Sequence, residues 1–323
     1  MADLVSAEGR ILEQILNASH EIWHEGLSRD RYARFFEAQR RTAWGATRLS
    51  RWALVDGIDV LASAKEYSLR AVLDGRPIEV VGIGAVFTQP EQRGRRHARD
   101  LIERMLARGA RRGAGLALLF SEIGADYYAR LGFIPMPTID RTLAVATSDR
   151  HGAPAAMIRS GHDRDLDAIV AMNHTRAKPF RFHLDRDRDL LSYAITKKRL
   201  LAGFGRAGVR EVHFFVTEEG TTAVAYVVLS VRGGQWTLEE CGDRDPSGAR
   251  VGAILQALIA REPAQRHPAI RAWLPPGFLP PQVSIVATCS ASDVMMLRPL
   301  TPDADAARTL GVDDVLYWRD DVF

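Results

Sequence analysis

The chain has 323 residues, of which 46% are hydrophobic and 26% are charged, as in globular proteins with one large domain or two of ordinary size. Its two cysteines exclude a disulfide framework, and no apolar stretch approaches the ~20 residues that span a bilayer. The formal net charge of +3, with no basic region before an apolar run at the start, predicts a cytoplasmic protein without a signal peptide.

The first predicted element is an amphipathic helix over about residues 8–18, where apolar residues recur at helical spacing. HEIWHE follows it, and His-Glu-x-x-His is the spacing that places two zinc ligands on one face of a helix. A zinc peptidase also needs a third ligand, which the following residues do not supply in the usual pattern. We therefore expect no metal site. A position beside an acceptor substrate for His24 or Glu25 and a plain surface position both remain open.

A second helix is predicted over about residues 29–42, with Ser28 as its N-cap. Strands are predicted at 47–57, 68–75 and 79–88. The last of these is a nearly continuous apolar run, as expected for a strand that is covered on both faces.

An arginine-rich turn then opens a helix over about residues 95–112. Between residues 93 and 112, eight arginines accompany only two acidic residues. The start of a helix presents unpaired N–H groups and the positive end of the helix dipole, and arginines add charged donors. This combination favours a compact anion such as a diphosphate over a long nucleic-acid track. The outer arginines, from Arg104 to Arg112, are predicted to form a solvated face.

A buried strand at 115–120 and a helix at 126–132 follow, and Gly132 is predicted to be a left-handed C-terminal cap. The arginine-rich turn and the later segment YYARLGF together resemble two motifs of the GNAT superfamily of acetyltransferases. The first corresponds to the loop that binds the acetyl-CoA pyrophosphate, although an arginine stands where the family has its middle glycine. The matching loop residues are Arg93, Gly94, Arg95, Arg96, His97 and Ala98.

The resemblance implies acetyl-CoA as the acyl donor and no metal. It makes Tyr128 the general acid that protonates the leaving thiolate. It also implies that the pantetheine arm lies along Val86, Phe87 and Thr88, with an N–H near Phe87 stabilising the oxyanion. Three candidates for the general base stay open, namely Glu79, Glu122 and the C-terminal carboxylate of Phe323.

The second half repeats the element order of the first without a residue-level repeat. Helices are predicted at 163–176, 185–201 and 248–261, and strands at 213–218, 222–231, 235–241 and 270–274. The chain thus resembles the enhanced-intracellular-survival type of acetyltransferase. We predict an α/β, mixed-sheet GNAT-like fold arising from tandem duplication. Residues 1–145 would bind acetyl-CoA, and a degenerate unit, 155–323, would border the acceptor site after a linker at about 146–156.

The predicted function is transfer of an acetyl group to a primary amine of a small molecule or peptide by direct attack in a ternary complex. The alternative is a catalytically decayed acyl-CoA sensor or assembly module, which the arginine at the glycine position favours and the intact tyrosine opposes. We expect no nucleic-acid or membrane partner, and leave assembly into a homo-oligomer open.

Overall fold

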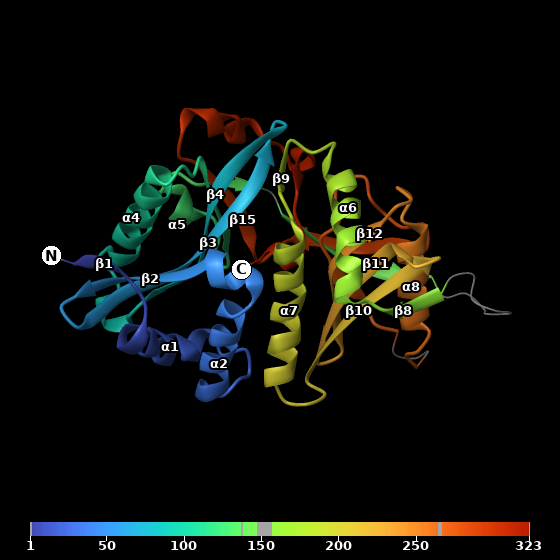
Figure 1. The fold of residues 1–323 in the computed structure, drawn as a ribbon, viewed down its shortest axis with the longest axis horizontal. Coiled ribbons are helices and arrows are strands. Elements are labelled where there is room, and N and C mark those ends of the chain that lie inside the picture. The colour runs from blue at the N-terminus through green and yellow to red at the C-terminus, as the bar shows by residue number, and fades with distance from the viewer. Residues whose placement is uncertain (1, 137, 147–156, 264–266, 323) are drawn as a thin grey trace.

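The computed structural model describes residues 2–136, 138–146, 157–263 and 267–322. Two mixed β-sheets stand side by side, each with helices on its faces, and α6 and α7 lie near the middle of the view (Figure 1). This architecture confirms the predicted α/β fold with mixed sheets. Among the described helices, none is both long and apolar enough to cross a membrane.

The first sheet contains strands from both halves of the chain. Its main order is β1 (Asp3–Ser6), β2 (Leu49–Asp56), β3 (Asp59–Leu73), β4 (Arg76–Thr88), β5 (Leu116–Ser121), β15 (Val294–Pro299) and β6 (Ile134–Met136). Two short strands extend it beside β3, namely β9 (Phe182–Leu184) and β16 (Val315–Leu316). Strands β4 and β5 are parallel.

Helices cover both faces of this sheet because neighbouring strand residues point to opposite sides. The bounds are α1 (Gly9–Trp23), α2 (Arg29–Arg40), α3 (Ala43–Arg48), α4 (His97–Arg111) and α5 (Asp126–Ala129). On β2, Ala53 packs with Ile15 of α1, whereas Leu54 packs with Leu101 of α4. As predicted, Ser28 caps α2, because its side chain accepts a hydrogen bond from the backbone N–H of Arg31.

The second sheet has the order β14 (Val283–Ser290), β7 (Ile139–Val145), β13 (Ile270–Ala272), β12 (Gln235–Asp243), β11 (Thr222–Arg232), β10 (Arg210–Glu219) and β8 (Met157–Ser160). Helix α8 (Ala249–Ile259) packs on one face. Helices α6 (Leu166–Ala177) and α7 (Arg188–Phe204) pack on the other. Helix α7 also contacts α2 and α3, so it joins the two units.

The two units repeat one arrangement of strand, helix and parallel strand. In the first, β4 leads through α4 to β5; in the second, β12 leads through α8 to β13, and both strand pairs are parallel. Each unit also lends a strand to the other. Strand β15 lies between β5 and β6, and β7 lies between β13 and β14. Each sheet therefore contains strands from both predicted domains, residues 1–145 and 155–323.

Local structure differs from the predictions in several places, two of which lie near the start of the chain. The strand expected at 47–57 begins only at Leu49, because α3 occupies the residues before it and Thr42 caps that helix by accepting from the N–H of Gly45. Strand β1 was not predicted, since four residues carry little periodicity. Most of the predicted linker, residues 147–156, lies outside the described residues.

We expect a fragment of residues 1–145 to show no cooperative thermal unfolding by circular dichroism. It lacks β15, so β5 and β6 would lose the strand that joins them, together with the buried side chains of Met295 and Leu297. As a control, residues 1–136 fused through a flexible linker to residues 291–301 should regain part of the transition. A cooperative transition for the unfused fragment would contradict this expectation.

Candidate active site

Strands β4 and β5 separate at one end of the first sheet. Their pairing runs from Val80 opposite Leu116 to Ile83 opposite Leu119 and then stops, although both strands continue. The register of β4 against β3 shifts just beyond this point, where Ala85 adopts a φ of 47°. The split exposes backbone groups to which an extended molecule can bind in the manner of an added strand.

The predicted pantetheine-contacting residues lie on this separated part of β4. Val86, Phe87 and Thr88 all follow the last pair that β4 forms with β5. The Phe87 side chain is buried and its ring lies 6.2 Å from that of Trp23, edge to face. The end of α1 therefore covers one side of the split.

The arginine-rich turn joins β4 to α4 through two residues with left-handed backbone. Gly94 has a φ of 79°, and Arg96, the N-cap of α4, has a φ of 65°. Arg96 thus adopts the conformation for which glycine is favoured, at a cost of roughly 1–2 kcal/mol. Its side chain does not cap the helix, so the first N–H groups of α4 remain available to an anion.

The side chains of the turn are arranged for contact with such an anion. Arg93, Arg95 and Arg96 are exposed, whereas His97 and Ala98 are half-buried at the helix start. The six residues that resemble the phosphate loop thus lie around one helix N-terminus, which offers backbone N–H donors and exposed arginine side chains.

The equivalent turn of the second unit is closed by the protein itself. The Asp243 carboxylate accepts a hydrogen bond from the N–H of Arg250, and the Ser247 hydroxyl accepts one from the N–H of Ala249. The N-terminus of α8 therefore already holds a negative charge from its own chain.

Aromatic packing also closes that second turn. Gly248 has a φ of 71° and occupies the N-cap of α8, as Arg96 does in α4. A Cβ atom at Gly248 would lie 2.6 Å from the ring of Phe278, which comes from the proline-rich loop before β14. Of these two turns, the one before α4 is therefore open to an anion, and the one before α8 is not.

Of the four outer arginines, Arg111 and Arg112 are exposed as predicted, whereas Arg104 and Arg108 are bound to other residues of the protein. The Arg108 guanidinium donates to the buried carboxylate of Glu66 at 2.8 Å and lies 3.8 Å from the ring centre of Trp52. Arg104 bonds to Asp100 and to the backbone oxygen of Ala2. These partners hold both side chains against the protein.

Tyr128 lies in α5 and is buried, with its ring edge-on to the rings of Tyr127 and Phe133. Burial raises the pKa of Tyr128 to about 12, and Tyr127 and Glu122 add to the shift. Its hydroxyl therefore stays protonated at neutral pH and can donate a proton. The predicted cap is present, since Gly132 has a φ of 80°.

Glu122 follows β5 directly, at the end of the strand where β4 and β5 separate. Burial raises its pKa, the charges of Asp293 and Glu25 add to this, and a hydrogen bond with Trp23 opposes it. The three acids come from three separate segments of the chain. They form a group of acids beside the split, to which we refer as the acidic rim (Glu25, Glu122 and Asp293).

Glu79 lies elsewhere. It is exposed near the start of β4, opposite Arg70 of β3. Four residues separate it from Ile83, where the strands part, which corresponds to roughly 13 Å along a strand.

The α1–α2 loop connects the rim to the second unit. The Glu25 carboxylate pairs with Arg210 of β10 at 2.8 Å and with Arg232 of β11 at 3.1 Å. The ring of His24 accepts a hydrogen bond from the N–H of Gly26 through Nδ1. Glu25 thus lies near Glu122 but already has two cationic partners, whereas His24 bonds within its own loop.

The HEIWHE histidines have protein partners of their own. His20 Nε2 lies 2.9 Å from the Leu27 carbonyl oxygen, and the two rings are 5.3 Å apart. Across the described residues, no group of three or more His, Cys, Asp or Glu side chains is placed to hold a metal ion.

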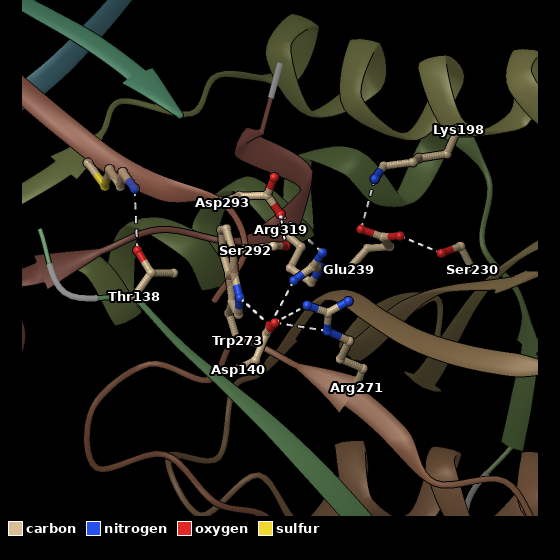
Figure 2. A network of polar contacts seen from close by, with 11 residues as sticks. Thr138, Asp140, Lys198, Ser230, Glu239, Arg271, Trp273, Ser292, Asp293 and Arg319 are labelled. Carbon is tan, nitrogen blue, oxygen red and sulfur yellow. Dashed lines mark hydrogen bonds and ion pairs between the residues drawn. The ribbon is translucent and has the colours of Figure 1, made fainter. Parts of the chain in front are cut away.

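A polar network that sequence reasoning missed contacts Asp293 of the rim (Figure 2). Arg319 lies 2.8 Å from the buried carboxylate of Asp140 and 3.7 Å from that of Asp293. Asp140 also accepts from Trp273 Nε1 at 2.6 Å and from Arg271. These residues are far apart in the sequence, so no local pattern could have indicated the network.

The C-terminal segment reaches the first unit beside α7. Val322 lines a small cavity with Trp44, Tyr67 and Tyr193, and its carbonyl oxygen accepts from Lys197 Nζ at 2.8 Å. Phe323, the third candidate base, lies outside the described residues.

Comparison with known proteins agrees with this geometry. Residues 12–136 match the family model described as acetyltransferase (GNAT) domain. No curated protein sequence matches the chain significantly.

Solved structures of low sequence identity share the fold. A GCN5-related N-acetyltransferase from Anabaena variabilis ATCC 29413 has 12% identity and a TM-score of 0.66, over 93% of this chain and 73% of that one. A GCN5-related N-acetyltransferase from Kribbella flavida has 19% identity and a TM-score of 0.64, over 95% and 73%. Eis1 from Mycobacterium abscessus has 14% identity and a TM-score of 0.57, over 96% and 76%.

Proposed function

We propose that the protein transfers an acetyl group from acetyl-CoA to a primary amine, because residues 12–136 match the GNAT acetyltransferase domain. Acyl-CoA-dependent acyl transfer is the general activity of this family. The choice of acetyl donor, the amine acceptor and the residue roles are the content of the proposal.

The open start of α4 is the observation that carries the proposal. The α4 turn offers unpaired N–H groups and three exposed arginines, whereas the matching α8 turn is neutralised by Asp243 and filled by Phe278. A diphosphate fits the first turn and is excluded from the second. The adjoining split between β4 and β5 suits the extended arm that follows the diphosphate in CoA.

When bound, acetyl-CoA would supply the activated thioester. The residues of the chain would then act around the reacting carbonyl. The N–H near Phe87 donates a hydrogen bond to the thioester oxygen as negative charge develops on it. The Tyr128 hydroxyl gives its proton to the departing sulfur, and its raised pKa keeps that proton in place beforehand.

We propose Glu122 as the general base in preference to Glu79 and the Phe323 carboxylate. Glu122 lies where the strands part, close enough to Tyr128 to influence its pKa. The pKa of Glu122 is raised toward neutral pH, and this makes its carboxylate a better acceptor for the proton of an amine. The exposed Glu79 lies well away from the split.

The acceptor would be a small molecule or a peptide with a cationic amine. Within the acidic rim, Glu25 and Asp293 already pair with arginines, so Glu122 is the acid that would favour a positively charged group. The aromatic ring of Trp23 provides a surface for the apolar part of the acceptor. The second unit also borders the acidic rim, because its residues Arg210 and Arg232 form ion pairs with Glu25.

Calorimetry on EDTA-treated protein tests the donor site, with acetyl-CoA compared with CoA and dephospho-CoA. We expect micromolar binding of acetyl-CoA without metal, followed by turnover in a screen of primary amines. Binding without turnover of any amine would favour the sensor alternative. Absence of binding would refute the proposal.

Glu122→Gln is expected to lower kcat/KM about 100-fold and to remove the acidic limb of the pH profile. A base must be deprotonated, so the wild-type rate should fall as pH drops through the Glu122 pKa. Because that pKa is raised, the fall should occur above the range of an ordinary glutamate. Glu79→Gln serves as the control and should keep the limb. If Glu79→Gln removes it instead, the assignment of Glu122 is wrong.

A further inference from the structure

The second sheet ends in a long strand that is open on one side. Strand β14 pairs with β7 and with no other strand in the described part of the chain. Its sequence is VSIVATCS, and every residue after Val283 is exposed. An edge strand keeps a row of unpaired N–H and C=O groups, so β14 can pair with one further strand.

The other edges of the described sheets are short. Strands β1 and β8 have four residues each, β6 has three and β16 has two, whereas β14 has eight. Strands β1 and β8 also carry a charged residue each, Asp3 and Arg159, and β14 carries none. The one interruption of β14 is a shift of register against β7 at Val286. Short length and charge prevent pairing at sheet edges, and β14 has neither.

Apolar side chains gather around this edge. Ten large hydrophobic residues are exposed in the described part of the chain, and the exposed fraction of Val286 is 58%. Four of the ten lie on β14, on β7 or in the loop before β14, namely Ile139, Leu279, Ile285 and Val286. A partner strand would therefore remove apolar surface from water as well as complete the backbone hydrogen bonds.

The composition of β14 favours a second copy of the same chain as the partner. A strand without charge has nothing to orient an acidic or a basic peptide, but it does not repel an identical strand. Two copies related by a two-fold axis can pair antiparallel, because such an axis brings the same surface of each chain together. Pro280 and Pro281 precede the strand and limit the pairing to β14 itself.

We propose that two copies of the protein associate by antiparallel pairing of their β14 strands, which joins their second sheets into one continuous sheet. A two-fold axis in an antiparallel pair sets one residue opposite its own copy. Val286 and Ala287 lie at the middle of β14, so one of them occupies this central position. The interface is distant in the fold from the split between β4 and β5, which belongs to the first sheet, and is independent of the proposed function.

Gel filtration with light scattering measures the mass of the full chain in solution. Wild type should have twice the chain mass at micromolar concentration. Val286→Lys should have the mass of one chain, because two lysines would meet near the centre of the pair. Val209→Lys is the matched control and should stay dimeric, since Val209 is 50% exposed but lies outside β14. A monomeric wild type, or an assembly that Val286→Lys leaves intact, would overturn the proposal.

Cross-linking through a central cysteine is a second measurement, and it decides the question if Val286→Lys does not fold. Cys289→Ser removes the exposed cysteine and leaves the buried Cys241. In that background, either Val286→Cys or Ala287→Cys should form a disulfide between chains on oxidation, seen as a band of twice the mass on a non-reducing gel.

Ser284→Cys in the same background is the control for cross-linking. Its Cα atom would lie roughly 13 Å or more from its own copy in the proposed pair, whereas a disulfide requires about 7 Å or less. It should therefore stay unlinked. Equal cross-linking at all three positions, or none at the two central ones, would refute the pairing. Both readouts measure association, so a protein that fails to transfer acetyl groups leaves them unaffected.

Discussion

Replacing His97 by glutamate is expected to weaken acetyl-CoA binding about 100-fold without destabilising the protein. His97 is the first residue of α4, where an acidic side chain interacts favourably with the helix dipole. The same carboxylate would repel the diphosphate. At about 5 Å and an effective dielectric constant of ~20, two unit charges interact by roughly 3 kcal/mol, or about two powers of ten in affinity. Calorimetry with acetyl-CoA and thermal unfolding measure the two effects.

Ala249→Glu provides the matched control, because Ala249 is the first residue of α8 in the second unit. That helix start is already neutralised by Asp243. Acetyl-CoA affinity should therefore stay at the wild-type value. If both variants bind equally well, the diphosphate does not contact the start of α4. Equal loss in both would indicate a general effect on the fold.

Tyr128→Phe is expected to lower kcat about 100-fold while acetyl-CoA affinity changes little. The substitution removes one hydroxyl and keeps the buried ring, which packs against Phe133. Without the hydroxyl, the sulfur must leave as a thiolate. The loss should therefore appear in turnover and not in binding. Steady-state kinetics and calorimetry on the same preparation separate the two.

Tyr127→Phe tests whether the effect belongs to Tyr128 alone. Tyr127 is adjacent in α5 and also has a raised pKa, chiefly because of burial, but it does not occupy the motif position. It should keep most of its turnover. Unaltered turnover in Tyr128→Phe would remove that residue from the mechanism, and a large loss in Tyr127→Phe alone would transfer the role to it.

Features that depend on neighbouring residues were predictable from the sequence. Helical spacing of apolar residues located α1 and α4, and a serine before charged residues located the start of α2. The left-handed backbone at Gly132 followed from its place after a helix. The phosphate loop and the tyrosine segment indicated the family because their order and spacing are local properties of the chain.

Features that join distant residues were decided by the tertiary structure. The sequence did not show that β15 would complete the first sheet and β7 the second, since any strand of suitable pattern can fill such a position. Nor could it place Asp293 beside Glu122, or Arg108 on Trp52 instead of in solvent.

The sequence by itself therefore determined most of the longer elements and indicated the family, because hydrophobic period, turn chemistry and motif spacing act over a few residues. The tertiary structure decided which of the two helix starts is open and which acids border the split. These depend on burial and on charge pairs between segments more than 100 residues apart, such as Arg319 with Asp140, for which no local pattern exists.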